Sequence, residues 1–132
     1  LIVEDDMIWN QFDRGYPIYK KLVSNPFDVL CLGGACVEYN PQTYKAKYVS
    51  TTTAYLVNNH YYQTLLANYK EGVEQFIQHE DKHSLYALDR NLMKLMNKDN
   101  WFVIQPALCV QKPGYSDIEN KFVNYNPQFG VW

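Results

Sequence analysis

The feature that most constrains the fold is an apolar run at residues 27–32 (FDVLCL), which ends at the pair Gly33-Gly34. A second, shorter apolar run, LIV, occupies residues 1–3. Short apolar runs bounded by turn residues are typical of strands that are buried on both faces of a sheet. We therefore expect two such strands, with a flexible turn at the glycine pair, because glycine adopts conformations that other residues avoid.

Helical and strand patterns alternate along the rest of the chain. Apolar residues recur at helical spacing in three regions, residues 17–23, 58–69 with a continuation over 71–78, and 85–96. Further strands are expected at residues 48–57, 101–104 and 107–111, with an irregular excursion over residues 35–48. This alternation predicts an α/β fold, with a mainly parallel, mixed sheet and flanking helices, in a single domain over residues 1–132.

Charge and composition exclude several classes of protein. The chain carries 12 Lys and Arg against 14 Asp and Glu, and this balance argues against a nucleic-acid partner, which needs clustered positive charge. No apolar stretch reaches the ~20 residues of a transmembrane helix. The cysteines, Cys31, Cys36 and Cys109, form no CxxC pair, so we expect reduced thiols and a cytoplasmic type of compartment.

Three acidic residues, Glu4, Asp5 and Asp6, follow the first apolar run. Ligands of open α/β sheets bind outside the carboxyl ends of strands. Because side chains alternate along a strand, Glu4 and Asp6 are expected to point one way and Asp5 the other. Two converging carboxylates would hold Mg²⁺ or Mn²⁺ and leave coordination sites for phosphates. The alternative is that the acids only complement the dipole of a following helix.

The acidic segment LIVEDD at residues 1–6 resembles the strand and acidic motif of nucleotide-sugar-dependent glycosyltransferases with the GT-A fold. Within that group it is similar to the "LEDD" version in family 25, which includes lipooligosaccharide and collagen galactosyltransferases and viral members. Four further stretches resemble the same group, at residues 28–33, 52–57, 86–89 and 111–118. The chain resembles only the carboxyl-terminal half of such a domain, so we expect the nucleotide-binding strands to precede it and this polypeptide alone to be inactive.

The resemblance implies transfer of a hexose from a nucleotide sugar such as a UDP-hexose to the hydroxyl of a glycan or protein, with inversion. A divalent cation, Mn²⁺ or Mg²⁺, would rest against the diphosphate of the donor. Carried onto this chain, Asp6 is the direct metal ligand, and Glu4 contacts the metal, a water molecule or the ribose. A bound cation stabilises the charge that develops on a departing diphosphate.

An inverting transfer also needs a base for the proton of the acceptor hydroxyl. Asp89 is the best candidate by resemblance, and Asp117 is the next acid to consider; the alternative for Asp89 is an acid in the first turn of a helix. The resemblance also implies substrate-binding roles for Glu4, Asp5, Gly33, Gly34, Thr52, Thr53, Gln111, Tyr115 and Ser116.

The rival interpretation is a non-catalytic carbohydrate-binding or protein-interaction module. Such a module would use exposed aromatic platforms, for which the candidates are Trp9, Tyr39, Tyr44 and Trp101. A binding module needs no paired acids after a buried strand. Such a module is also more often all-β. Thermal stabilisation by UDP that depends on manganese, measured on the chain with its preceding segment, would distinguish the two interpretations.

Overall fold

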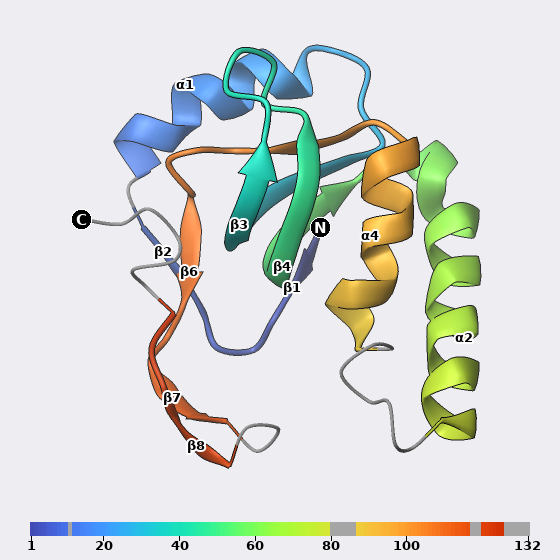
Figure 1. Ribbon diagram of the computed structural model, residues 1–132. Coiled ribbons are helices and arrows are strands. Elements are labelled where there is room, and N and C mark those ends of the chain that lie inside the picture. The colour runs from blue at the N-terminus through green and yellow to red at the C-terminus, as the bar shows by residue number, and fades with distance from the viewer. Residues whose placement is uncertain (11, 80–86, 117–119, 126–132) are drawn as a thin grey trace.

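The computed structural model describes residues 1–10, 12–79, 87–116 and 120–125, with the backbone alone for residues 35–37. Figure 1 shows helices packed around a small sheet. The elements are β1 (Ile2–Val3), β2 (Met7–Trp9), α1 (Phe12–Val23), β3 (Val29–Tyr39), β4 (Ala46–Val57), a 3₁₀ turn (Asn59–Tyr61), α2 (Tyr62–Gln78), α4 (Leu88–Lys98), β5 (Trp101–Val103), β6 (Cys109–Gln111), β7 (Gly114–Ser116) and β8 (Lys121–Val123).

The main sheet has four strands in the order β1-β4-β3-β5. The β3–β5 pair is parallel, whereas β1–β4 and β3–β4 are antiparallel. The α/β class and the mixed sheet are confirmed, but the expectation that parallel pairs predominate is wrong. The reason is the connectivity. Strands β3 and β4 follow one another through a short turn and must run in opposite directions. Among the described strands only β3 and β5 are parallel, and β4, α2 and α4 lie between them in the sequence.

The β3–β4 hairpin is longer than the sequence predicts. The expected irregular excursion over residues 35–48 is largely strand, and Gly33 and Gly34 lie inside β3 instead of forming a turn. The actual turn lies at residues 40–45, where Asn40 Oδ1 accepts hydrogen bonds from the backbone N–H groups of Gln42 and Thr43 at 2.9 and 3.1 Å. The side chain of Asn40 therefore closes the hairpin.

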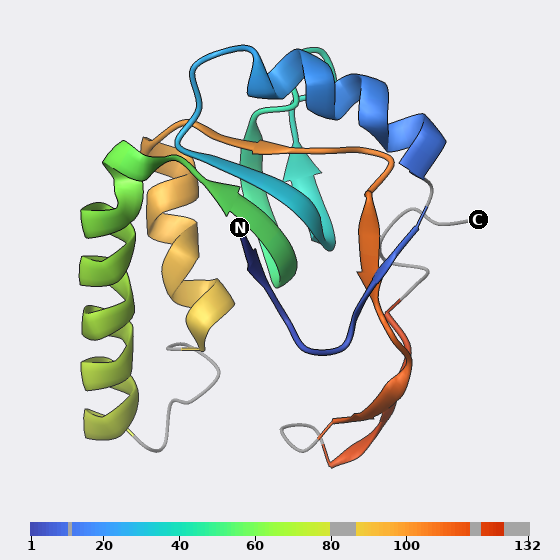
Figure 2. The ribbon, with the colours of Figure 1, turned by 180° about the vertical axis from the view of Figure 1, so that it is seen from behind.

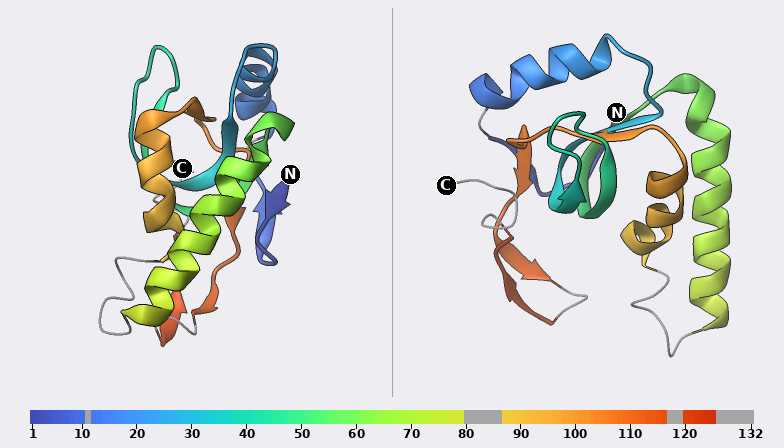
Figure 3. Two further views of the ribbon diagram at one scale, coloured as in Figure 1. Left: turned by 90° about the vertical axis from the view of Figure 1, so that its right-hand side faces the viewer. Right: turned by 45° about the horizontal axis from the view of Figure 1, so that its top comes forward.

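Alternating side chains of β3 bury opposite faces of the sheet. Val29 and Cys31 pack with Leu92 of α4 in one cluster, and Leu30 and Leu32 pack with Leu22 of α1 in another. Figures 2 and 3 show the corresponding layers, with α2 and α4 together on one side and α1 on the other. This alternation places a helix on each face of the central strand. The buried strand expected at residues 27–32 is confirmed for residues 29–32, since β3 begins at Val29.

Strand β1 differs from the expectation of a strand buried on both faces. Leu1, Ile2 and Val3 are 64%, 40% and 47% exposed. In the described part of the chain β1 is an edge strand, paired with β4 alone through Ile2–Tyr55 and Val3–Ala54. The prediction that this strand is buried is therefore wrong. A run of three apolar residues indicates hydrophobicity, but it does not indicate where a strand lies in the sheet.

The helices follow the predicted pattern with different limits. Helix α1 begins at Phe12 instead of Pro17, α2 continues through Gln78, and α4 begins at Leu88. By residue type and position, Asn58 and Ser84 are the candidate N-caps of the helices expected at residues 58–69 and 85–96. Ser84 lies outside the described residues. Asn58 precedes the 3₁₀ turn, and its side chain donates to the Phe27 carbonyl instead of capping. Throughout the described part of the chain, every helix falls short of the length and apolar character that crossing a bilayer requires.

Candidate functional site

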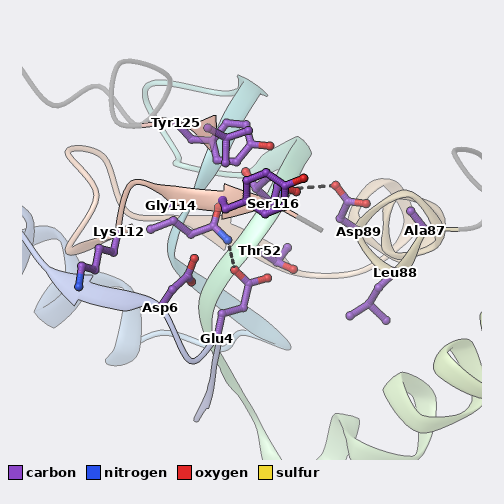
Figure 4. A pocket seen from close by; sticks show the side chains of 14 residues that line it. Glu4, Asp6, Thr52, Ala87, Leu88, Asp89, Lys112, Gly114, Ser116 and Tyr125 are labelled. Atoms are coloured by element: carbon purple, nitrogen blue, oxygen red, sulfur yellow. Dashed lines mark hydrogen bonds between the residues drawn. The ribbon is translucent and has the colours of Figure 1, made fainter. Parts of the chain in front are cut away.

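A pocket of about 390 Å³ brings together segments that are far apart in the sequence. Such a volume lies in the range of small-molecule sites. Seven of the predicted site residues line it, namely Glu4, Asp6, Thr52, Asp89, Gln111, Tyr115 and Ser116. Figure 4 shows Glu4 and Asp6 on one side of the pocket, with Lys112 and Asp89 at opposite ends. The pocket is thus built by the loop after β1, by β4, by the start of α4 and by β6 to β8.

The acidic residues lie in a turn instead of continuing β1. The Met7 N–H donates to the Glu4 carbonyl at 3.2 Å, and the Glu4 N–H donates to the Thr53 carbonyl at 2.9 Å. The Lys112 N–H donates to the Asp6 carbonyl at 2.8 Å. These bonds fix the turn between β4 and the end of β6, so that Glu4 and Asp6 line the pocket and Asp5 is exposed. The predicted separation of the three acids is confirmed, although a turn produces it.

The environment of Glu4 disfavours its negative charge. Burial raises the pKa of Glu4, and the neighbouring charges of Asp6, Asp89 and Asp5 raise it further. The opposing contribution is a hydrogen bond of 2.6 Å that Gln111 Nε2 donates to Glu4 Oε2. A positive charge placed in this pocket would relieve the repulsion among the carboxylates.

Asp6 supplies a test of whether the site fits a divalent cation. Its Oδ1 atom is buried and has no hydrogen-bond partner among the described residues. A buried carboxylate oxygen without a partner is costly unless a ligand satisfies it. No group of three Asp, Glu, His or Cys residues in the described part of the chain forms a metal site, so the protein would supply two carboxylates and leave the rest of the shell to substrate and water. This donor set fits Mg²⁺ or Mn²⁺.

Asp89 lies in the first turn of α4 and borders the pocket. Its Oδ2 accepts a hydrogen bond from the Thr51 N–H at 3.1 Å, and its Oδ1 accepts one from the Arg90 N–H at 2.8 Å. The carboxylate therefore bridges the start of α4 and β4. This arrangement suits both a base that faces the pocket and an acid that stabilises a helix start.

Thr51 is a site residue that the sequence does not reveal. The β3–β4 register passes from Gly33–Ala54 to Ala35–Ser50, so residues 51–53 of β4 bulge opposite the single residue Gly34. Within this bulge Thr51 has a φ of 44°, which is rare for a β-branched residue. The bulge turns the Thr51 N–H toward Asp89 instead of toward β3.

The bulge depends on the absence of a side chain at Gly34. A Cβ at this position would lie 2.9 Å from Val49 Cγ1 and 3.1 Å from the Thr51 carbonyl oxygen. At Gly33 a Cβ would lie 2.5 Å from Cys109 Sγ and would meet the Cys109 carbonyl. Both glycines thus permit close packing of β3, and neither lines the pocket for which the sequence nominated them.

The remaining predicted residues have other positions. Asp5 is exposed and does not line the pocket. Thr53 is fully buried and acts as support, because its carbonyl accepts from the Glu4 N–H and its hydroxyl donates to the Thr51 carbonyl at 3.3 Å. Asp117 lies outside the described residues.

Lys112 is a lining residue that the sequence reasoning passed over. It lies within the stretch at residues 111–118 that carries the family resemblance, and that position was the available signal. With Glu4, Asp6 and Asp89, it gives the described lining three acidic side chains and one basic side chain. The acidic side chains would therefore repel an anionic ligand unless a cation binds together with it.

The proposed aromatic platforms are only partly available. Trp101 is fully buried, and its Nε1 donates to the Tyr61 hydroxyl at 3.2 Å. Tyr39 and Tyr44 stack against each other with ring centres 6.5 Å apart. Trp9 is 56% exposed. Trp101 is therefore a core residue, and its assignment as an exposed platform is wrong.

Comparison with known proteins does not assign the chain to a family. No family model matches it, and neither the curated proteins nor the solved structures contain a match.

Proposed function

We propose that the chain carries the reaction centre of a metal-dependent glycosyltransferase of the GT-A type, which moves a hexose from a nucleotide sugar to an acceptor hydroxyl. The observation that carries this proposal is the convergence of Glu4, Asp6 and Asp89 on one pocket from two distant parts of the sequence. The same three acids are those to which the motif resemblance assigns the metal and the base. An acidic pocket with a buried, unpartnered carboxylate oxygen is what a cation–diphosphate ligand requires.

In this proposal Asp6 and Glu4 hold the divalent cation. When bound, the cation supplies electrostatic stabilisation of the negative charge that develops on the leaving diphosphate. Asp6 contributes Oδ1, which lacks a protein partner among the described residues. Glu4 stays connected to Gln111 through the 2.6 Å hydrogen bond, which fixes the orientation of its carboxylate.

Asp89 acts as the base. The oxygen of the acceptor hydroxyl forms a bond to the anomeric carbon of the hexose while the bond from that carbon to the diphosphate oxygen breaks, and the hydroxyl proton moves to the Asp89 carboxylate. The Thr51 N–H occupies one acceptor position of Oδ2 and holds the side chain in place. Each carboxylate oxygen has a second lone pair, so acceptor capacity remains for the proton.

The test is cation-dependent binding of UDP, measured on the longest natural polypeptide that contains this chain. Mn²⁺ and UDP together should raise the melting temperature more than the sum of their separate effects, because each completes the site of the other. Asp6→Asn should abolish this synergy, whereas Asp5→Asn should retain it, because Asp5 is exposed and lies outside the pocket.

The same experiment separates the rival interpretation. Saccharide binding that needs no divalent cation and that survives Asp6→Asn would favour a carbohydrate-binding module. Release of UDP from a UDP-hexose, dependent on Mn²⁺ and on Asp89, would favour the transferase. Absence of both cation-dependent UDP binding and donor turnover contradicts the proposed function.

A further inference from the structure

Gln111 carries a second unpartnered acceptor in the pocket. Its Oε1 atom is buried and has no hydrogen-bond partner among the described residues, although the side chain lines the pocket. Buried side-chain oxygens are almost always satisfied in folded proteins. Because Gln111 lines the pocket, a ligand bound there can supply the missing partner.

The orientation of the Gln111 amide is set by its neighbour. Nε2 donates to the Glu4 carboxylate at 2.6 Å, and a carboxylate accepts hydrogen bonds. The nitrogen must consequently face Glu4. Because the amide is planar and its two polar atoms diverge, Oε1 faces away from the Glu4 carboxylate.

This geometry selects the kind of group that can reach Oε1. Oε1 is an acceptor and needs a donor, so a phosphate oxygen cannot serve. A cation held by Glu4 and Asp6 would lie on the acid side of the amide, away from Oε1. Hydrogen-bond donors remain, and apart from one N–H on uracil those of a UDP-hexose are the hydroxyls of its hexose and its ribose.

We propose that Gln111 Oε1 accepts a hydrogen bond from a sugar hydroxyl of the bound ligand and so makes Gln111 a specificity-determining residue. The inference rests on the proposed function for the identity of the ligand as a nucleotide sugar. One side chain thereby has two roles. Its Nε2 orients the Glu4 carboxylate, and its Oε1 accepts a hydrogen bond from one hydroxyl of the ligand. The ligand then satisfies an acceptor that the protein leaves open.

The first arm of the test measures affinity by calorimetry in Mg²⁺ on the longest natural polypeptide containing this chain. The ligands are UDP, 2′-deoxy-UDP, UDP-glucose, UDP-galactose and the monodeoxy-hexose analogues. Gln111→Met removes both amide groups at similar length, and Gln63→Met makes the same exchange at an exposed position of α2. Gln111→Met should weaken binding about 3- to 10-fold, the range expected for one lost hydrogen bond, and Gln63→Met should change nothing.

The decisive comparison is between variant and analogue. In the unsubstituted protein, one deoxy analogue should lose about the same 3- to 10-fold. In Gln111→Met, that same analogue should lose nothing further, because the partner of the missing hydroxyl is already gone. A match with a deoxyhexose places the hydroxyl on the hexose, and a match with 2′-deoxy-UDP places it on the ribose. Two results overturn the inference. In one, Gln111→Met lowers the affinity for all ligands equally. In the other, the loss of affinity caused by Gln111→Met adds to the loss caused by removing any one hydroxyl.

The second arm needs neither a variant nor nucleotide binding. Methyl hexosides and a methyl riboside are titrated into the ¹⁵N-labelled chain while the side-chain amide resonances are followed. The resonance of Gln111 should shift and that of Gln63 should stay. Cation-dependent UDP binding without a response of Gln111 to any sugar overturns this inference and leaves the proposed function standing. A shift of Gln111 in a chain that does not bind UDP supports hydroxyl recognition and contradicts the proposed function.

Discussion

The backbone N–H of Thr51 donates a hydrogen bond of 3.1 Å to Asp89 Oδ2. This contact joins a bulge in the middle of β4 to the first turn of α4, across 38 positions of sequence. The bulge exists because residues 51–53 are accommodated opposite Gly34. The orientation of the proposed base is thus set by backbone geometry in a different element of the fold.

Asp89→Asn should separate the catalytic role from the structural role. The substitution keeps the shape of the side chain and an acceptor for the Thr51 N–H but removes basicity. Loss of a general base typically costs about 10²–10⁴-fold in rate, whereas loss of a favourable charge in a first helical turn costs about 0.3–1 kcal/mol of stability. Turnover and melting temperature are measured side by side.

The matched control for this exchange is Asp13→Asn, which removes a first-turn acid from α1. It should affect stability to a similar extent and leave turnover unchanged. Preserved turnover in Asp89→Asn would assign Asp89 to the helix start and make Asp117 the next acid to test. Lost turnover with unchanged melting and unchanged UDP binding would support the base.

Asp6→Ala should weaken Mn²⁺ binding. Two protein carboxylates cannot fill an octahedral shell, so metal affinity is expected to be weak alone and to rise with UDP. Removing one ligand should lower the affinity for Mn²⁺ in the presence of UDP by at least about 10-fold, since even the loss of a residue that only hydrogen-bonds to a metal ligand reaches this size. Paramagnetic relaxation of water protons reports the bound Mn²⁺. Asp5→Ala is the control, and equal effects of both substitutions would contradict the assignment.

Glu4 should make stability depend on pH. Because burial and neighbouring acids raise its pKa above the ordinary value of 4.5, the folded chain binds the proton more tightly than the unfolded chain. The resulting stabilisation is fully present below that ordinary value and is lost as pH rises through the raised pKa. Urea unfolding at acidic and neutral pH measures the difference, which should stay below about 1 kcal/mol because the site is partly solvated.

Glu4→Gln should remove this pH dependence while keeping an acceptor for Gln111. At neutral pH without divalent cation it should be at least as stable as the unsubstituted chain, and it should respond less to Mg²⁺. Glu74→Gln, at an exposed position of α2, serves as the control. A Glu4→Gln chain with the original pH profile would show that other groups cause it.

Gly34→Ala should destabilise the fold through the β4 bulge. The added Cβ would lie 2.9 Å from Val49 Cγ1 and 3.1 Å from the Thr51 carbonyl oxygen, so β4 must shift. Overpacking of this kind costs about 1–3 kcal/mol. Gly114→Ala is the control, because the nearest atom would be 3.8 Å away, and its cost should stay within about 0.5 kcal/mol. Equal costs for both substitutions would show that the bulge tolerates a side chain at Gly34.

The apolar edge of the molecule should cause self-association. Leu66 of α2 is 45% exposed and lines an apolar groove of about 290 Å³ together with Leu1 and Ile2. Ile2 belongs to β1, which is at the edge of the sheet in the described part of the chain. Exposed sheet edges and apolar patches promote association. Size-exclusion chromatography should show concentration-dependent elution that Leu66→Lys reduces, whereas Thr64→Lys, at an exposed position of the same helix, should not. A stable monomer at all concentrations would contradict this expectation.

The sequence predicted those features that depend on local pattern. The continuous apolar run at residues 27–32 predicted a strand buried on both faces, and the spacing of apolar residues predicted the helices. The order Glu4, Asp5, Asp6 predicted two acids on one side and one on the other, which the turn after β1 produces. The helices and the buried strand follow from local sequence pattern, which is a property of consecutive residues. The separation of the acids was predicted from strand alternation, but a turn produces it.

Only the tertiary structure decided how the pieces meet. The direction of β4 beside β3, the edge position of β1, the bulge at Thr51 and the contact of its N–H with Asp89 all depend on residues distant in sequence. The same holds for the packing that requires glycine at position 34. A hydrophobic pattern reports that a face is buried, but which partner buries it, and in which register, is set by long-range contacts that the pattern does not contain.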